Sequence, residues 1–401
     1  MIMFGRLRAV VTAALPTAEK IAGAVQTRAV VARLGVLLGP AFAICFVTGL
    51  ISHNAQSTTG IGLRPWPSWG YRVSQGIHVA TGIACLPLLL AKVFAAYPRI
   101  LDRPDPQHNG PNARARPHWP SLIRFGAERG LTGILTVAGI VEVSTGLFNI
   151  FQWYLFRFAF VPVHYAVGWV AIGAIMIHVA IKLPAIRQAF RRGRPTRRPV
   201  AELDALRTTR RGFLIGVFAV LGGLTLATVG QTVGLFDRLA LLSPRRPRSA
   251  QLHGVPVNRT AHAAAVLDRL SDWRLTVAGP TSARVFDRAA LARLPQVTVD
   301  LPIACVEGWS VSASWSGVRV SELLRLVDAA GHDVRVVSLE QRSPYGVTRL
   351  PQEFIADPRT ILATSLNGEE LDPDHGYPAR IIAPNRPGVL QTKWVERIEV
   401  R

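Results

Sequence analysis

Five long apolar runs and a polar last third divide the chain. The runs cover roughly residues 34–52, 73–97, 131–151, 158–183 and 213–235. Each is long enough to cross about 30 Å of hydrocarbon as an α-helix. Beyond them, short strand-like runs alternate with short helical patterns as far as residue 401. This pattern predicts an α-helical membrane bundle of four spans plus a fifth anchor span, followed by an α+β domain.

Within the polar third, the pattern predicts individual elements. Strands are expected at 273–278, 297–303, 334–339, 380–383 and 394–400. Helices are expected at 261–270, 287–293 and 319–327. About 150 residues are enough for this part to bury a core of its own.

The net charge of +21 on 401 residues comes almost entirely from arginine. Such a charge fits either nucleic-acid binding or a membrane protein with basic loops on one side. The basic residues precede the first run and fill the loops after the second and fourth runs, whereas the opposite loops carry only Arg64, Arg72 and Arg157. The positive-inside rule therefore places the N-terminus in the cytoplasm and the polar third outside. Membrane lipid surrounds the runs, and no nucleic acid is needed to explain the charge.

These observations predict six segments along the chain of a multi-pass protein of the bacterial cell membrane. Residues 1–30 lack a compact signal-peptide core and are expected to be a cytoplasmic tail. The following segments are a four-helix membrane domain (31–186), a basic cytoplasmic loop (187–211), the fifth span (212–236), a linker (237–250) and the extracytoplasmic domain (251–401).

Two histidines occupy equivalent places in a repeated pattern. His78 and His164 both lie early in runs that cross from outside to inside, so they lie at similar depth. Residues 77–82 match residues 163–168, and Thr-Gly-Leu precedes both segments, at 48–50 and 145–147. This predicts a duplicated two-helix unit. Two such imidazoles can supply both axial ligands of one haem iron; the alternative is that they bond across the bundle without a cofactor.

A third histidine extends this pattern. His178 follows His164 by fourteen residues, which returns it to nearly the same helix face about 21 Å deeper. The first four runs resemble the membrane cytochrome b subunits of bacterial formate dehydrogenases and hydrogenases, in which such a pair serves two stacked haems. Here residues 34–37 carry no histidine where that family has the other inner ligand, and His53 is at the wrong depth. One haem b is therefore expected, with His178 a candidate ligand of a second.

Glu142 lies midway along the third run. It is a candidate to take a proton from a quinol, and a hydrogen bond to a neighbouring helix is the alternative.

A basic motif precedes the fifth run. Thr208-Thr209-Arg210-Arg211-Gly212-Phe213-Leu214 resembles a twin-arginine translocation signal placed inside the chain. The resemblance implies that a twin-arginine translocase exports the following domain already folded and loaded with its cofactor. No small-residue cleavage site follows, so the fifth run is expected to remain as an anchor. The alternative is an ordinary basic flank.

Of the three cysteines, only Cys305 lies outside an apolar run. It follows a strand-like run and precedes a turn that contains Gly308. A free cysteine is usually a small buried hydrophobe, and the spacing alone favours that interpretation. The alternative is a thiolate that binds a metal or attacks a substrate.

Several motifs around Cys305 together resemble the sulfite-oxidase-type molybdopterin fold, particularly its periplasmic methionine-sulfoxide-reductase branch. The central one is Cys305-Val306-Glu307-Gly308-Trp309-Ser310, followed by Trp315-Ser316-Gly317-Val318 opening a helix. Further motifs lie at 255–260, 273–279, 366–371, 375–384 and 393–400. The resemblance covers nearly all of residues 251–401 and implies a sulfite-oxidase-type α+β fold.

The resemblance also implies a cofactor and the residues that hold it. Cys305 would be the thiolate ligand of a molybdenum chelated by a single pterin dithiolene, a soft ligand that suits oxo transfer. Glu307 would lie near the metal. The positions implied to contact the pterin or its phosphate are Asn258, Arg259, Arg380 and Lys393, with turns at Asn385 and Gly388. Without the resemblance, Arg380 and Lys393 would be surface charges and Asn258 a cap or turn residue.

Two features limit the resemblance. Residues 339–346 stand where the family usually has an Asp-Gly-Tyr turn in the substrate pocket, which leaves the substrate open. The chain also leaves no room for the C-terminal dimerisation domain of sulfite oxidases proper, which favours the reductase-like, monomeric branch.

The combined prediction is a molybdopterin-dependent oxidoreductase that passes electrons from quinol through haem b to an S-oxide or N-oxide, preferably a methionine sulfoxide. One alternative is a sulfite-like dehydrogenase that donates electrons to quinone. An alternative of another class is a metal-free binding module anchored in the membrane.

Overall fold

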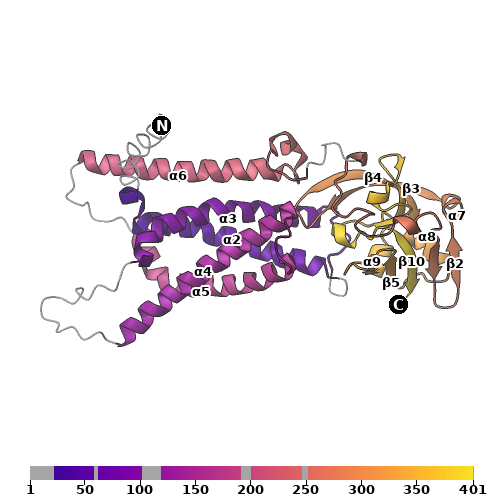
Figure 1. Cartoon of the computed structure of the whole chain (residues 1–401), viewed down its shortest axis with the longest axis horizontal. Coiled ribbons are helices and arrows are strands. Elements are labelled where there is room, and N and C mark those ends of the chain that lie inside the picture. The colour runs from indigo at the N-terminus through magenta and orange to yellow at the C-terminus, as the bar shows by residue number, and fades with distance from the viewer. Residues whose placement is uncertain (1–21, 58–61, 102–118, 191–199, 246–251, 401) are drawn as a thin grey trace, which may run out of the picture. The chain divides into compact units, whose positions relative to one another are not determined.

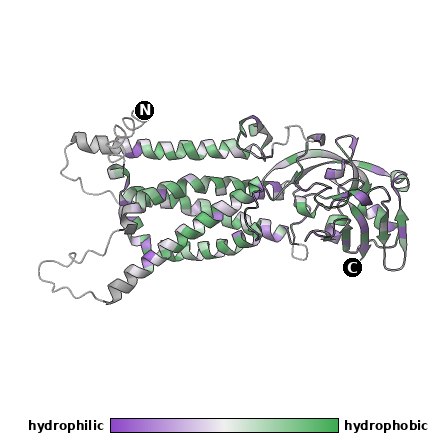
Figure 2. Cartoon of the chain, viewed as in Figure 1, coloured by the Kyte–Doolittle hydropathy of each residue, from purple (hydrophilic) through white to green (hydrophobic). Residues whose placement is uncertain are grey.

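The computed structural model describes residues 22–57, 62–101, 119–190, 200–245 and 252–400. Five long helices occupy the first part of the described chain (Figure 1). They are α2 (Arg28–Ala55), α3 (Gly70–Leu101), α4 (Trp119–Phe151), α5 (Phe160–Phe190) and α6 (Val200–Val229). Each is long and apolar enough to cross a membrane, and Figure 2 shows hydrophobic residues along all five. The five predicted spans are therefore confirmed as helices.

The end of the fifth helix differs from the prediction. Helix α6 ends at Val229, whereas the apolar run suggested Leu235. The chain turns back at Gly230, where an added Cβ would lie 2.2 Å from the carbonyl oxygen of Phe236. A short 3₁₀ helix, Gly234–Leu239, follows this turn. Hydropathy could not locate the end because the apolar composition continues through the turn.

The predicted orientation in the membrane rests partly on residues that the structure does not describe. Arg103, Arg114 and Arg116 lie within 102–118, and a second group of arginines lies within 191–199. Most of the predicted N-terminal tail is also outside the described residues. Orientation and domain limits therefore stay predictions.

The chain divides into two compact units. One contains residues 1–46 and 81–225, and the other contains residues 47–80 and 226–401. The second unit therefore combines the C-terminal end of α2 and the N-terminal turns of α3 with the whole last third of the chain. Helices α2 and α3 therefore each contribute residues to both units.

The last third folds into two five-stranded sheets. In the first, the strand order is β2-β1-β10-β5-β6, with β1 parallel to β10 and the other pairs antiparallel. In the second, the order is β3-β4-β7-β8, and β9 also pairs with β7, all antiparallel. The strands are β1 (Leu275–Ala278), β2 (Ala283–Phe286), β3 (Gln296–Ala304), β4 (Ser310–Arg319), β5 (Val334–Ser338), β6 (Val347–Leu350), β7 (Ile361–Leu366), β8 (Glu369–Glu370), β9 (Arg380–Ile382) and β10 (Val395–Val400).

Short helices connect the strands. The α-helices are α7 (Arg288–Ala292), α8 (Val320–Arg325) and α9 (Gln352–Ile355). Four 3₁₀ helices span Leu252–Gly254, Leu267–Arg269, Pro373–His375 and Gly388–Leu390. Asp287 caps α7, because its side chain accepts a hydrogen bond from the backbone N–H of Ala290. The mixture of sheets and short helices confirms the predicted α+β class.

The five predicted strands correspond to β1, β3, β5, β9 and β10, and the helices predicted at 287–293 and 319–327 correspond to α7 and α8. The helix predicted at 261–270 was wrong, and the motif expected to open the helix at 319 lies in a strand. Residues 261–270 form turns and the short 3₁₀ helix, since Ala265 has a positive φ of 54° that a helix does not accept. Trp315-Ser316-Gly317-Val318 belongs to β4, and the next helix begins only at Val320.

Two hydrophobic clusters form the interior of this part. The larger packs residues of β1, β5, β10 and α8, among them Leu275, Val336 and Leu323. The smaller packs residues of β3, β4 and β7, and it contains Cys305 and Trp315. The cysteine singled out in the sequence therefore lies in the interior, next to the second sheet.

Candidate functional site

Cys305 occupies a tight loop between two paired strands. The last pair of the β3–β4 ladder joins Ala304 to Ser310, so residues 305–309 form the connection. Within it, the N–H of Cys305 donates to the carbonyl of Trp309 at 2.9 Å, and the N–H of Gly308 donates to the carbonyl of Cys305 at 3.1 Å. These bonds fix the loop, and Cys305 is only 1% exposed.

The sulfur of Cys305 has polar groups around it. Asn258 Nδ2 donates to Sγ at 3.4 Å, and the backbone N–H groups of Glu307 and Val306 also point at the sulfur. Burial raises the pKa of the thiol well above its ordinary value, and the negative charge of Glu307 adds to this effect. A thiol in this state is a poor nucleophile, whereas a soft metal ion can take the place of its proton.

Asn258 and Arg259 connect the Cys305 loop to a second region. Arg259 forms an ion pair with Glu340, with Nη2 and Nε at 2.7 and 2.8 Å from Oε1. Glu340 belongs to the segment 339–346 that departs from the family resemblance. The structure thus brings Asn258 to the predicted metal ligand, while the Arg259 side chain points toward the departing segment.

Glu307 is buried close to the loop. Its Oε2 accepts a hydrogen bond from Trp309 Nε1 at 3.3 Å and lies 3.9 Å from Arg245 Nε. Sequence reasoning did not include Arg245, which stands in the predicted linker. No motif identified it, because an arginine in a basic linker has no distinguishing pattern.

Arg380 is a fully buried cation. Its Nη1 and Nη2 donate to the carbonyls of His375 and Gln391 at 2.9 and 3.2 Å, and its guanidinium lies 5.1 Å from the Trp315 ring centroid. Its Nε is buried and has no hydrogen-bond partner among the described residues. Burial lowers the pKa of Arg380 to about 9.

Lys393 is the second cation of this site. Its Nζ donates to the carbonyls of Arg259 and Asp374 at 3.0 and 2.7 Å. Burial, followed by the positive charge of Arg380, lowers the pKa of Lys393 to about 7. Neither residue is the plain surface charge that the residues alone suggested.

The two cations and the sulfur form a donor set that fits an anionic metal cofactor. Both Arg380 and Lys393 bond to carbonyl oxygens, and the Nε–H of Arg380 is left to bond an additional acceptor. A phosphate near them would raise both pKa values and satisfy that N–H. Cys305 adds the soft sulfur ligand for molybdenum. The residues therefore fit the group that the resemblance implies.

The side chain of Asn385 bonds to residues at the start of helix α3 and just before it. Its backbone turns with a positive φ of 54°, as predicted for this stretch. Its side chain accepts from the N–H of Tyr71 at 2.5 Å and donates to the carbonyl of Arg64 at 2.7 Å. In the neighbouring turn, a Cβ on Gly388 would lie 3.1 Å from the carbonyl oxygen of Ala304. This turn therefore packs against the strand that leads to Cys305.

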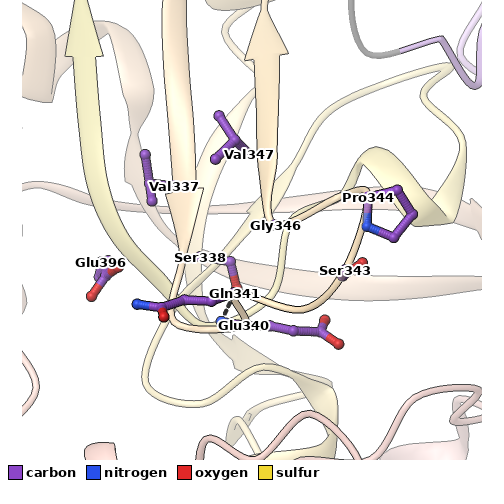
Figure 3. Close-up of a pocket in the computed structure, with 9 residues that line it drawn as sticks. All are labelled: Val337, Ser338, Glu340, Gln341, Ser343, Pro344, Gly346, Val347 and Glu396. Atoms are coloured by element: carbon purple, nitrogen blue, oxygen red, sulfur yellow. Dashed lines mark hydrogen bonds between the residues drawn. The ribbon is translucent and has the colours of Figure 1, made fainter.

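The segment that departs from the resemblance lines a pocket of about 270 Å³. Figure 3 shows its lining residues, with the N–H of Glu340 donating to Ser338 Oγ at 3.0 Å. The lining residues are Val337, Ser338, Glu340, Gln341, Ser343, Pro344, Gly346, Val347 and Glu396. Through Glu340, Arg259 and Asn258, this pocket is linked by bonded neighbours to Cys305.

The two repeated histidines have matching surroundings, each within its own unit. His78 Nδ1 lies 3.4 Å from Thr48 Oγ1, and His164 Nδ1 lies 3.0 Å from Thr145 Oγ1. The glycine after each threonine faces the ring, since an added Cβ would lie 3.0 Å and 3.5 Å from the respective Cε1 atoms. The repeated Thr-Gly pair in the sequence therefore makes the same contacts with both histidines.

These contacts suit a metal-binding histidine. A hydrogen bond to Nδ1 fixes the ring and directs Nε2 toward a metal. In His164, Nε2 lies 3.3 Å from Glu142 Oε2, so iron binding there requires this carboxylate to move aside. His178 lies near the charges of Lys92, Lys182 and Glu128, and Lys182 and Glu128 form an ion pair that the sequence did not predict.

Comparison with known proteins relates the last third to molybdenum enzymes. Residues 262–401 match the family model described as the oxidoreductase molybdopterin binding domain. The mitochondrial sulfite oxidase of Drosophila melanogaster is 30% identical over 156 residues, which are 32% of this chain and 27% of that protein. The protein-methionine-sulfoxide reductase catalytic subunit MsrP of Burkholderia mallei is 28% identical over 142 residues, which are 31% and 43% of the two chains.

A third relative is a protein of Azospira oryzae named as protein-methionine-sulfoxide reductase subunit YedZ1. It is 31% identical over 131 residues, which are 32% of this chain and 49% of that protein. The chain thus spans less than half the length of each of these three relatives.

Arg380→Met tests whether this buried cation binds an anionic cofactor. A lost charge-assisted hydrogen bond costs about 1.5–3 kcal/mol, so we expect pterin bound per protein to fall at least about 10-fold. Pterin is measured as its fluorescent oxidation product in purified full-length protein.

Arg386→Met is the matched control. Arg386 is also buried and donates to carbonyls, those of Leu390 and Arg349, and burial lowers its pKa to about 9. We expect this variant to keep its pterin. Equal pterin content in both variants, whether kept or lost, would contradict the assignment of Arg380.

Proposed function

Because residues 262–401 match the oxidoreductase molybdopterin binding domain, we propose that the chain is a membrane-bound enzyme that reduces an S-oxide or N-oxide with electrons from quinol. The chain is an oxidoreductase by this domain. For a sulfoxide, the S=O bond breaks, and quinol and sulfoxide give quinone, sulfide and water. Quinol supplies the two electrons and two protons. The observation that carries the proposal is the buried Cys305 sulfur, which interacts with Lys393, in a domain where Arg380 and Lys393 donate to carbonyls.

Four residues would hold the cofactor in this proposal. Cys305 would ligate molybdenum, Asn258 would donate toward the sulfur, and Arg380 and Lys393 would bind the anionic pterin. When bound, the molybdenum–pterin group supplies two-electron oxygen-atom transfer. The chain itself excludes water from the sulfur by burial and keeps Asn258 Nδ2 directed at it. The pocket lined by residues 337–347 is the proposed substrate site.

In this proposal, the membrane part would carry the electrons from quinol to the last third of the chain. His78 and His164 would be the axial ligands of one haem b, and Thr48 and Thr145 would orient their rings. Glu142 on α4 contacts His164 Nε2 on α5, which matches the alternative of a bond to a neighbouring helix; its role as the group that takes a proton from quinol stays a candidate. The alternative is that the membrane part holds two haems, with His178 as a ligand of the second.

Methionine sulfoxide is the favoured substrate class because two relatives are named as protein-methionine-sulfoxide reductase subunits. The second candidate is a sulfite-like dehydrogenase that delivers electrons to quinone, favoured by the similarity to a sulfite oxidase. The membrane-anchored binding module has no such support, since the matched domain is an oxidoreductase domain.

The Cys305→Ser variant tests whether the proposed catalytic site can be disabled while the membrane part stays intact. A hydroxyl is a hard ligand and does not replace a soft thiolate, so sulfoxide reduction is expected to fall to the background of a protein-free assay. The visible haem spectrum of the purified variant is expected to stay that of the wild type. Cys85→Ser is the control, since it changes another buried thiol; it is expected to keep activity. Full activity in Cys305→Ser would refute the assignment.

Arg210 and Arg211 are proposed to direct export through a twin-arginine translocase, which would place the last third outside the cytoplasm. Both lie in helix α6. Changing them together to Lys-Lys keeps the charge, so the first four helices should still insert while the last third stays inside. Protease accessibility of the last third in spheroplasts measures this. Unchanged accessibility would exclude the signal.

A further inference from the structure

The loop that carries Cys305 is held by the first turns of helix α3. Gln75 is 4% exposed, and its Nε2 donates to the carbonyl of Val306 at 2.8 Å. Its Oε1 accepts from Ser52 Oγ at 2.7 Å. The side chain is therefore fixed at both ends, and one end holds the peptide that directly follows Cys305.

A second contact lies one turn further along the same helix. Gly308 has a positive φ of 95°, and a Cβ there would lie 2.6 Å from Val79 Cγ2 and 3.0 Å from Gln231 Nε2. Only glycine allows this loop and helix to approach so closely. Thr232 Oγ1 also donates to the carbonyl of Gly308.

A third contact lies one turn before Gln75. Tyr71 is 1% exposed and packs in a cluster with Ala304, the residue before Cys305. Its N–H donates to Asn385 and its hydroxyl lies 3.3 Å from Ser52 Oγ.

Residues 71, 75 and 79 are spaced by four, so they share one face of α3. Along this face they contact, in order, the residue before Cys305, the residue after it, and the glycine of its loop. His78 lies in the same stretch, three residues after Gln75. One face of a membrane helix thus supports the Cys305 loop beside the proposed haem ligand.

We infer that Gln75 is a positioning residue that holds the Cys305 loop on α3 and completes a bonded path between His78 and Cys305. The path runs along the α3 backbone from His78 to Gln75, through one hydrogen bond to Val306, and along one peptide to Cys305. Its electron-transfer part rests on the proposed function.

Electron tunnelling is faster through covalent and hydrogen bonds than across a gap. If His78 and His164 hold a haem b, that group would supply one electron at a time to this path and quinol would be its reductant. Two electrons with two protons would balance the conversion of one sulfoxide to sulfide and water.

Gln75→Leu removes the hydrogen bond and nearly keeps the volume. The holoenzyme is reduced in detergent, freed of reductant and mixed rapidly with methionine sulfoxide, and haem reoxidation is followed by absorbance. We expect reoxidation to slow at least about 10-fold, which corresponds to a rise of about 1.4 kcal/mol in the apparent activation free energy, with unchanged haem potential and molybdenum content.

Two further variants control for indirect effects. Gln56→Leu removes a glutamine that donates to the same Ser52, at 2.9 Å, and should reoxidise at the wild-type rate. Gln75→Glu keeps size and the acceptor for Ser52 but loses the donor to Val306, so it should be slow even if the leucine variant folds poorly. Wild-type rates in both Gln75 variants would overturn the electron path.

Hydrogen exchange supplies a readout that needs no cofactor. Amides of residues 304–310 are expected to exchange faster in Gln75→Leu than in wild type or Gln56→Leu. Equal exchange would overturn the role of Gln75 in holding the loop. If instead wild-type haem is not reoxidised by any S-oxide or N-oxide while the exchange difference is present, the proposed function fails and the structural role of Gln75 is supported.

Discussion

The burial of Arg380, which bonds to carbonyls and to no carboxylate among the described residues, is the constraint on which the site depends. Arg380 lies inside the protein, where an uncompensated cation is costly, and it donates to two carbonyl oxygens. Lys393 is partly buried, donates to two carbonyl oxygens and also interacts with the charges of Asp374 and Glu340. The buried sulfur of Cys305 lies close enough to Lys393 for the two to interact. Cationic donors and a soft sulfur in one dry region are what a metal–pterin anion needs. The two sheets and their connecting loops place these groups together from distant parts of the chain.

The membrane helices add a second ordered arrangement. The same threonine–histidine contact occurs at Thr48 and His78 and at Thr145 and His164. The first histidine shares a compact unit with the last third of the chain. The N-terminal turns of α3 therefore belong structurally to the domain that carries Cys305.

The sequence predicted the spans well, because a helix in lipid must be apolar along its whole length. It failed where structure depends on distant contacts. Strand β4 was missed although its serines alternate with Val311, Ala313 and Trp315 as in a strand, because the segment at Trp315 was expected to open a helix. The helix at 261–270 was wrong because Ala265 takes a positive φ and Ala261 bonds to Asp374, far away in sequence. From their residue types alone, Cys305 suggested an inert thiol and Arg380 a surface charge; only the family resemblance made them candidate site residues. Gln75 gave no signal, since its partner is 231 residues away.

The central claim is that one chain joins a haem in the membrane to a molybdenum site near Cys305. It is tested most directly by the visible spectrum of the purified wild-type protein during one cycle. A quinol analogue should produce the bands of a reduced b-type haem, and methionine sulfoxide should then restore the oxidised spectrum with one sulfide formed per quinol consumed. A protein that shows no b-type bands, or whose reduced bands persist with every S-oxide and N-oxide offered, would contradict the account.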